Sequence, residues 1–234
     1  KKQQARTEVK VSALTVTPKE IKALPSTGGE ADIAQYLQII PGVISTGDQG
    51  GQIYIRGGSP VQNRILLDGI TVFNPFHSIG LFSVFETEVI RSVEVLTGGF
   101  PAEYGGRISA IVDIKTREGN KTRQAGMLSV SPFMAKAILE GPISRFSDES
   151  KGSTSYLVTA KKSFIDQTSE KLYQYALDEG ADRLPFQFED YYAKISTVSG
   201  NGSFLNAFGF SFNDDVRYSN LAALDWNAFG MGSN

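Results

Sequence analysis

The stretch IYIRGGSPVQNRILLDGI (residues 53–70) and the stretch SVEVLTGGFPAEYGGRISAIVDIK (residues 92–115) decide the fold of this chain. They contain four short strand-like runs joined by glycine-rich turns, at residues 53–58, 64–69, 92–99 and 107–115. In the last run apolar residues alternate with mostly polar ones, which predicts strands with one buried face. The residues expected on that face are Ile108, Ala110, Val112 and Ile114.

Composition limits the classes of protein. The 234 residues suffice for two ordinary domains, and a net charge of -2 offers no basic field for a phosphate backbone, which argues against nucleic acid. The chain has no Cys, so disulfides and thiolate sites are excluded. No run reaches the roughly 18 apolar residues of a spanning helix, although membrane-spanning β-strands stay open. Because it begins without Met or an apolar signal core, we expect a processed or trimmed piece.

Residues 1–52 predict one extended segment and one helix. The segment TEVKVSALTV (residues 7–16) alternates, and its simplest interpretation is an edge strand. Thr27 and Glu30 have the spacing of a capping box, which predicts a helix that Pro41 and Gly42 terminate. The apolar stripe expected on that helix is Ile33, Tyr36, Leu37 and Ile40.

A longer loop, ITVFNPFHSIGLF (residues 70–82), separates the second and third runs, and a short helix is expected over residues 84–90. The loop is apolar, and we expect it to be partly exposed as a contact surface. The alternative is that Phe73, Phe76 and Phe82 fold back onto the core.

After Arg117 the composition changes, which predicts a domain boundary followed by strands. The expected strands are residues 126–131, 134–140, 155–164, 190–199, 203–212 and 224–231, of which the first two could instead be one.

Side-chain alternation and loop length in this region favour a membrane β-barrel. In residues 203–212 we expect the phenylalanine face to point outward and small residues to point inward, as in a barrel strand. A soluble β-sandwich predicts a similar alternation. The connection SGNG (residues 199–202) is short, whereas residues 165–189 and 213–223 are long, and such alternation of short and long connections favours the barrel.

The sequence offers few residues that could serve in catalysis. His77 is the only histidine, with no nucleophile elbow or second nitrogen ligand near it, and the glycine clusters lack the GK[ST] ending of a phosphate loop. The carboxylates at strand ends occur singly rather than in acid/base pairs. We therefore expect no enzyme activity, no metal and no cofactor. The carboxylates considered are Asp68, Glu94, Glu103 and Asp113.

The order of motifs resembles the plug domain of TonB-dependent outer-membrane receptors. The elements are DIAQYLQIIPGV (residues 32–43), IYIRGG, NRILLDGI (residues 63–70) and VIRSVEVLTGGFPAEYGGRISAIVDIKTREG (residues 89–119), in the order of the family. The match covers about residues 30–118, and NPFHSIGLF and PAEYGGRISAIVDIKTR are similar to receptors from the Bacteroidetes.

The resemblance implies an α+β plug domain over residues 27–118, with an N-terminal extended segment over residues 1–26. Residues 119–234 are then the first antiparallel strands of a transmembrane β-barrel, which is incomplete in this chain because six strands cannot close a barrel of roughly 22.

As function, the resemblance implies an outer-membrane receptor whose plug, inside the barrel lumen, gates energised uptake of a scarce nutrient. Its partners would be a TonB-like periplasmic energising protein, outer-membrane lipid and a substrate that is a siderophore or cobalamin, a glycan or a peptide. The N-terminus would be periplasmic. The alternatives are an accessory or gating subunit of a protein-export or sensing complex in the outer membrane, and a soluble β-rich binding module.

Three sets of site residues follow from the resemblance. A Ton-box-like segment would add as a strand to the energising protein; it comprises Glu8, Val9, Lys10, Val11, Ser12 and Ala13. Arg56 would be a latch toward barrel glutamates, with Glu94 as a weaker partner. Thr97 stands where the family often has a second arginine, so the two-arginine latch does not carry over whole, and Arg91 and Arg107 are only candidates to compensate. Residues expected to face substrate, or else to pack on the barrel wall, are Thr46, Asp48, Gln49, Ser59, Gln62, Phe73, Asn74, Phe76 and His77.

Overall fold

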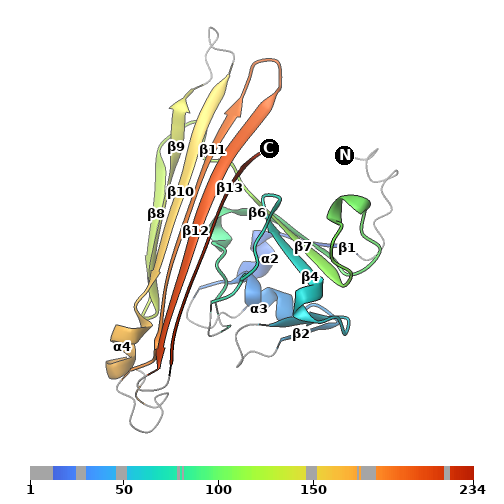
Figure 1. The fold of residues 1–234 in the computed structure, drawn as a ribbon. Coiled ribbons are helices and arrows are strands. Elements are labelled where there is room, and N and C mark those ends of the chain that lie inside the picture. The colour runs from blue at the N-terminus through green and yellow to red at the C-terminus, as the bar shows by residue number, and fades with distance from the viewer. Residues whose placement is uncertain are drawn as a thin grey trace. The chain divides into compact units, whose positions relative to one another are not determined.

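The computed structural model divides into two compact units, Lys1–Arg117 and Glu118–Asn234 (Figure 1). The residues that the structure describes are 13–24, 30–45, 52–77, 80, 82–145, 152–172, 174, 183–218 and 222–234.

The first unit is built on a five-stranded mixed sheet. Its strand order is β1-β6-β7-β4-β5, in which β4 and β7 run parallel and all other neighbours run antiparallel. The strands are β1 (Ala13–Val16), β4 (Asn63–Leu67), β5 (Ile70–Thr71), β6 (Ile90–Leu96) and β7 (Ala110–Thr116). All four predicted runs contain strands, but the first run, as β3 (Ile53–Ile55), pairs with β2 (Val43–Ser45) in a separate two-stranded sheet.

β7 is buried on both faces, so the expectation of one buried face is wrong for this strand. Ile111 and Val112 point to opposite faces and are both fully buried, and Asp113 is 4% exposed. The reason is its central position between β6 and β4. Ile108, expected on the buried face, precedes the strand and is 79% exposed.

The helices of the first unit are short. They are α2 (Pro18–Lys22), α3 (Ile33–Gln38) and the 3-10 turns η2 (Pro60–Gln62), η3 (Thr87–Val89) and η4 (Ala102–Tyr104). The helix expected over residues 84–90 is only η3, whose cap is the Glu86 side chain accepting from the amide of Glu88 at 3.0 Å.

α3 begins later than the capping-box spacing predicts. Its N-cap is Asp32, and Glu30 lies before the helix, while Thr27 lies outside the described residues. The apolar stripe is confirmed for Ile33 and Leu37, which are buried, whereas Tyr36 is half-buried. Asp caps a helix well because its side-chain oxygen accepts from an early helical amide.

The second unit is a six-stranded antiparallel meander with the order β8 to β13, drawn side by side in Figure 1. The strands are β8 (Ala125–Val130), β9 (Met134–Ser144), β10 (Ser153–Ser163), β11 (Phe186–Val198), β12 (Phe204–Tyr218) and β13 (Ala222–Ser233), with α4 (Ile165–Leu172) between β10 and β11. Each expected strand is present, and the first two are separate. The described strands form one sheet, so a two-sheet sandwich is not this fold.

The expected long connection over residues 213–223 is wrong, because β12 continues through Tyr218 and β13 begins at Ala222. Connections at one end of the sheet therefore span residues 131–133, 164–185 and 219–221. Their lengths differ widely, and short and long connections do not alternate as the sequence suggested.

The phenylalanine face of β12 is the buried face, so its predicted outward orientation is wrong. Phe208, Phe210 and Phe212 are buried, whereas Leu205 and Ala207 on the other face are exposed. The rings of Phe210 and Phe212 stack with centroids 4.7 Å apart. Stacking stabilises the Phe210–Phe212 part of this face, while Phe204 at the start of β12 is 67% exposed.

Candidate functional site

β1 is an edge strand that continues the Ton-box-like segment. Among the described strands it pairs with β6 alone, through four antiparallel positions from Ala13 opposite Leu96 to Val16 opposite Val93. Residues 8–12 lie outside the described residues, and Ala13 is the first residue of β1. Displacement of the N-terminal segment would therefore act first on a short edge strand. Ala13 packs against a hydrophobic cluster of Leu66, Leu96, Tyr104 and Ile111.

A capping box fixes the chain directly after β1. The Glu20 carboxylate accepts hydrogen bonds from the amide and the hydroxyl of Thr17, with Oε2 at 2.7 and 2.8 Å. Both hydrogen bonds lower the pKa of Glu20 below its usual value, and the one from the backbone amide has the larger effect. Lys22 then forms an ion pair with Glu88 at 2.6 Å. The segment after β1 is thus also attached to η3, which directly precedes β6.

Arg56, the expected latch, has a left-handed backbone conformation and an exposed side chain. Its φ is +48° and its amide donates to the carbonyl of Gly42 at 2.7 Å. Its guanidinium lies beside Gly98, where a Cβ would be 3.5 Å from Nη1. Non-glycine residues with positive φ are uncommon and concentrate at functional positions. Glu94, the expected weaker partner, is half-buried in β6 between Thr15 and Asp113.

The other described non-glycine residue with positive φ is Asp68, at +49° in the LDG turn. Its buried carboxylate accepts from the amide of Thr116 at 3.0 Å and from the hydroxyl of Thr116 at 2.6 Å. Asp tolerates this backbone conformation better than most residues. Asp68 therefore fastens the β4–β5 turn to the last residue of β7. In the sequence Asp68 is a single carboxylate at a strand end, and no pattern there predicts this contact.

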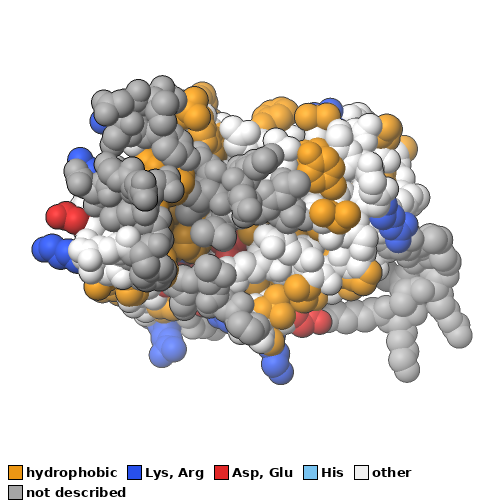
Figure 2. Space-filling view, turned by 90° about the horizontal axis from the view of Figure 1, so that it is seen from below, with side chains coloured by type: hydrophobic (Ala, Val, Ile, Leu, Met, Phe, Trp, Pro, Cys, Tyr) orange, Lys and Arg blue, Asp and Glu red, His pale blue; other side chains and the backbone are white. Residues whose placement is uncertain are grey.

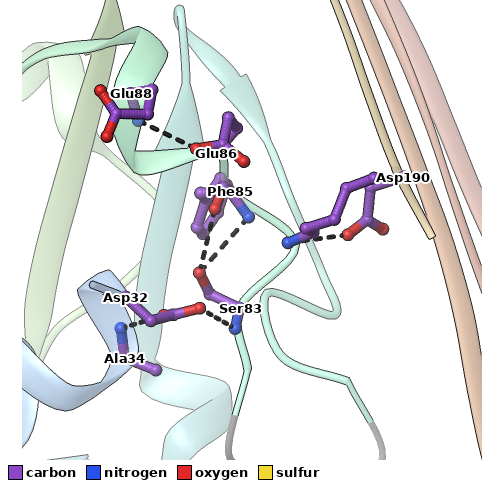
Figure 3. Close-up of polar contacts among 8 residues, drawn as sticks. Asp32, Ala34, Ser83, Phe85, Glu86, Glu88 and Asp190 are labelled. Carbon is purple, nitrogen blue, oxygen red and sulfur yellow. Dashed lines mark hydrogen bonds and ion pairs between the residues drawn. The ribbon is translucent and has the colours of Figure 1, made fainter. Parts of the chain in front are cut away.

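Asp32 makes a second long-range carboxylate contact (Figure 3). One carboxylate oxygen accepts from the amide of Ala34 at 2.7 Å, and the other accepts from the amide of Ser83 at 2.8 Å. The side chain is buried, and the Ser83 hydroxyl lies near the backbone of Phe85. One residue thus caps α3 and holds the loop that precedes η3.

Tyr104 of the AEYGG motif donates its hydroxyl to Asp113 Oδ2 at 3.0 Å. Burial, and then the negative charge of Asp113, raises the pKa of Tyr104 above its usual value. Lys115 lies 3.4 Å from the same carboxylate. A charged residue inside the apolar run of β7 was the sequence signal that could have identified this pair.

The residues expected to face substrate separate into exposed and buried ones. The loop is partly exposed, as expected: Phe73 is 78% exposed and Asn74 is exposed, whereas Phe76 and His77 are buried. The alternative that the phenylalanines fold back onto the core holds for Phe76 and Phe82 and not for Phe73. Ser59 and Gln62 are half-buried because they cap η2, with the Ser59 amide donating to Gln62 Oε1 at 3.0 Å. Thr46, Asp48 and Gln49 lie outside the described residues.

The topology gathers one further segment with Ser59 and Gln62. β4 and β7 are parallel and begin at the same end of the sheet, which brings residues 105–109 beside η2. Ser109 donates its hydroxyl to the carbonyl of Ile55 at 2.8 Å and its amide to that of Gln62 at 3.2 Å. A Cβ on Gly58 would lie 2.1 Å from Ser109 Oγ, so glycine is required there.

The buried face of the six-stranded sheet carries charged side chains. Lys161 of β10 and Asp190 of β11 are opposite each other and form an ion pair at 2.9 Å, with both side chains 6% exposed (Figure 3). The Lys161 ammonium is also 5.6 Å from the ring centroid of Phe188. Removing one member of such a pair would leave a buried charge.

Neither a metal centre nor a spanning helix is found in the described part of the chain. No group of three or more His, Cys, Asp or Glu side chains there is arranged to hold a metal ion. No helix among these residues is long and apolar enough to cross a membrane.

A small mixed sheet with short helices, followed by a long antiparallel meander, is the architecture of outer-membrane receptors that carry a plug. Residues 5–111 match the family model described as the TonB-dependent Receptor Plug Domain, so the first unit is a TonB-dependent receptor plug domain. The second unit has the fold of the antiparallel barrel strands that follow the plug in these receptors.

Two solved structures illustrate the likeness of fold. The FrpB iron transporter from Neisseria meningitidis superposes with a TM-score of 0.62 at 15% identity, covering 94% of this chain and 36% of that protein. The ferripyoverdine receptor of the outer membrane of Pseudomonas aeruginosa has a TM-score of 0.59 at 12% identity, covering 95% and 31%.

A curated relative from Escherichia coli (strain K12), the uncharacterized protein YddB, is 24% identical and covers 81% of this chain and 28% of its own length. The chain thus spans less than a third of that relative and about a third of the two receptor structures.

Proposed function

We propose that the protein to which this chain belongs is an outer-membrane TonB-dependent receptor whose plug gates energised uptake of a scarce nutrient. The observation that carries the proposal is the position of β1: a four-residue edge strand, directly continuous with EVKVSA, in a domain that matches the plug family. The nutrient would be a siderophore or cobalamin, a glycan or a peptide. The two proteins of similar fold, an iron transporter and a ferripyoverdine receptor, favour the first.

In the proposed mechanism, a TonB-like periplasmic protein captures residues 8–13 as an added strand. Main-chain hydrogen bonds give such strand addition its strength and let it transmit a pull. The pull reaches β1 first, where four residue pairs hold the edge, and then the Thr17–Glu20 box and the Lys22–Glu88 pair. Each of these contacts is local or exposed, so each yields before the central strands.

The central strands of the plug sheet would resist this pull. β7 is buried on both faces and the Asp68 carboxylate ties its end to the β4–β5 turn. We infer that force opens a path along β1 and leaves the parallel pair β4–β7 in place. Arg56, exposed beside Gly98, is available as the latch to an acidic side chain of the barrel. Substrate would meet the plug at Phe73 and Asn74 and at the end of the sheet that carries η2.

A reversible cross-link tests the role of β1. Leu14 and Val95 are opposite each other in the β1–β6 pair, and opposed residues have Cα atoms about 4.5–5.5 Å apart, within the range of a disulfide. In the full-length protein, with any cysteine outside these 234 residues replaced, Leu14→Cys with Val95→Cys should abolish nutrient-limited growth when oxidised and restore it when reduced. The single variants are matched controls.

The outcome separates the mechanism from its alternatives. Uptake that persists with the oxidised cross-link would show that β1 need not leave the sheet. A second variant, Val11→Pro, removes a backbone donor from the Ton-box-like segment and should reduce uptake. Unchanged uptake with this variant would favour an accessory role in export or sensing over import.

A further inference from the structure

One arginine of the plug, Arg64 in β4, joins three segments of the chain. Figure 2 shows Lys and Arg side chains that project from the margin of the view. Unlike side chains of that kind, Arg64 is half-buried and donates two hydrogen bonds within the plug. Its Nε donates to Thr71 Oγ1 of β5 at 3.0 Å, and its Nη1 donates to the carbonyl of Gly105 at 3.0 Å. A guanidinium suits this role because its donors point in fixed directions from one rigid plane.

Arg64 lies in a row of side chains that crosses the sheet to the edge strand β1. It is opposite Ile111 of β7, Ile111 is opposite Leu96 of β6, and Leu96 is opposite Ala13 of β1. Opposed residues point to the same face of a sheet, so these four side chains share one face. Ala13 is the last residue of the Ton-box-like segment and the first residue of β1. The row therefore connects Arg64 with the strand on which the proposed pull acts first.

The segment of residues 100–105, which contains η4, covers this row, and we call it the cover segment. Its Tyr104 side chain is buried in the hydrophobic cluster against which Ala13 packs. The Tyr104 hydroxyl donates to a carboxylate of β7, and the next residue, Gly105, accepts from Arg64. The cover segment is thus held at two consecutive residues. The other members of the cluster are Leu66, Leu96 and Ile111.

The two contacts that hold the cover segment differ in what they connect. The Tyr104 hydroxyl binds β7, the central strand that is buried on both faces. The guanidinium of Arg64 instead connects the cover segment with Thr71 of β5, at the edge of the sheet opposite to β1. Thr71 lies two positions before Phe73, the exposed residue at which substrate is proposed to meet the plug. Displacement of this part of the chain therefore reaches the cover segment through Arg64 without a change in β7.

β1 depends on the cover segment more than the other strands of the sheet do. It is paired with β6 at four positions, whereas β6 and β7 are paired at six. Leu14 and Thr15 are exposed, so the strand buries side chains mainly at its two ends, Ala13 and Val16. If the cover segment shifts, Ala13 loses its apolar contact and Val16 is left as the main apolar anchor of β1.

We propose that Arg64 is a positioning residue for the release of β1. It holds the cover segment over Ala13 and ties that segment to Thr71, so that displacement of residues 71–74 loosens the first pair of β1. The inference rests on the proposed function, in which substrate contact at Phe73 and Asn74 causes the displacement. The coupling is reciprocal, because a contact that favours release of β1 is itself favoured by that release.

Hydrogen exchange of the β1 amides in the full-length protein tests this role without a substrate. Arg64→Lys keeps the positive charge but does not hold both acceptors, since an ammonium group lacks the guanidinium fork. Exchange in β1 should become about tenfold faster, the scale of one hydrogen bond to a charged group, while exchange in β3 stays unchanged. Equal acceleration in β1 and β3 would show a general loss of stability and would overturn the proposal.

Arg107→Lys is the matched control, because it makes the same change next to the cover segment. The Arg107 guanidinium donates to the carbonyl of the adjacent Gly106 at 3.0 Å and joins no distant segment by this contact. Exchange in β1 should therefore be the same in this variant as in the unmodified protein. Acceleration by Arg107→Lys as large as that by Arg64→Lys would show that the effect is not specific to Arg64.

A double-mutant cycle tests the connection to Thr71. Thr71→Val removes the acceptor of Arg64 Nε and keeps a branched side chain of similar shape. Alone it should accelerate exchange in β1 and not in β3, and this result carries the test if Arg64→Lys does not fold. In the Arg64→Lys background it should have no further effect, because whichever acceptor the lysine retains, Thr71 and the cover segment are no longer joined. Additive effects of the two substitutions would overturn the proposal.

The exchange measurements and the uptake measurements separate this inference from the proposed function. If Val11→Pro reduces uptake but Arg64→Lys leaves exchange in β1 unchanged, the proposed function stands and Arg64 has no positioning role. If exchange follows the expected pattern but uptake is unaffected by Val11→Pro, the effect of Arg64 on β1 holds and the proposed function fails.

Discussion

The two sheets handle their charged residues in different ways. In the first unit the buried carboxylates of Asp32, at the N-cap of α3, and Asp68, in the β4–β5 turn, accept from backbone amides far away in sequence, those of Ser83 and Thr116. In the six-stranded sheet, charges are paired across adjacent strands, as in Lys161 with Asp190. The first arrangement joins distant elements and the second repeats along a ladder. The gating proposed above, in which the plug opens along one path, requires specific contacts of the first kind, whereas a sheet of regular strands requires only consistent alternation.

Among the substitutions that test this difference between the two units, Asp68→Ala should have the largest effect. It removes the charged acceptor of two hydrogen bonds and leaves the Thr116 amide buried, which costs about 2–3 kcal/mol. Hydrogen exchange of the β4 and β7 amides should accelerate strongly in the full-length protein. Asp225→Ala, on an exposed strand position, is the matched control, and equal exchange in the two variants would contradict the fastening role.

Asp32→Ala should destabilise the plug less, by about 1–2 kcal/mol, because it removes a helix cap and one contact with the Ser83 amide. Faster exchange is expected in α3 and in residues 82–86 together. Faster exchange in α3 alone would show that the contact with Ser83 does not contribute to the stability of the plug. Asp32→Asn keeps a capping oxygen and should recover most of the loss.

Tyr104→Phe should cost about 1 kcal/mol, the typical net value of one hydrogen bond. It should also change the alkaline stability of the plug. Because the fold raises the pKa of Tyr104, its contribution is complete below the usual tyrosine pKa near 10 and is lost as pH rises above it. The free energy of unfolding, measured from pH 8 to 11, should fall less steeply with pH in the variant. An identical slope would show that Tyr104 does not couple to the fold.

Glu20→Gln should have the smallest effect and should reveal itself through acid. Because the pKa of Glu20 is lowered in the fold, its contribution is present above the usual value near 4.5 and is lost as pH falls through the lowered value. The protection of the α2 amides against hydrogen exchange, relative to an unfolded chain at the same pH, should therefore depend less on pH in the variant between neutral pH and pH 3. Glu103→Gln, an exposed residue elsewhere in the plug, should leave that dependence unchanged.

The sequence predicted strands well where alternation decides, and less well where distant contacts decide. Residues 203–212 alternate clearly and form a strand, but the buried face was assigned to the wrong side because stacking of Phe210 with Phe212 cannot be distinguished from lipid exposure by period alone. The contacts of Asp32 with Ser83 and of Asp68 with Thr116 span 51 and 48 positions, and no local pattern predicts them. Arg56 was found through the motif, while its backbone conformation required the structure.

The alternation along β11 and β12 also distinguishes the correct strand pairing from a shifted one. A slip of one residue between β11 and β12 would turn a whole set of side chains to the opposite face. Asp190 and Lys194, which are buried, would then stand on the face where Tyr191 and Ile195 are now exposed, and the ion pair of Lys161 with Asp190 would be lost. The register of the sheet thus carries its own penalty against misassembly.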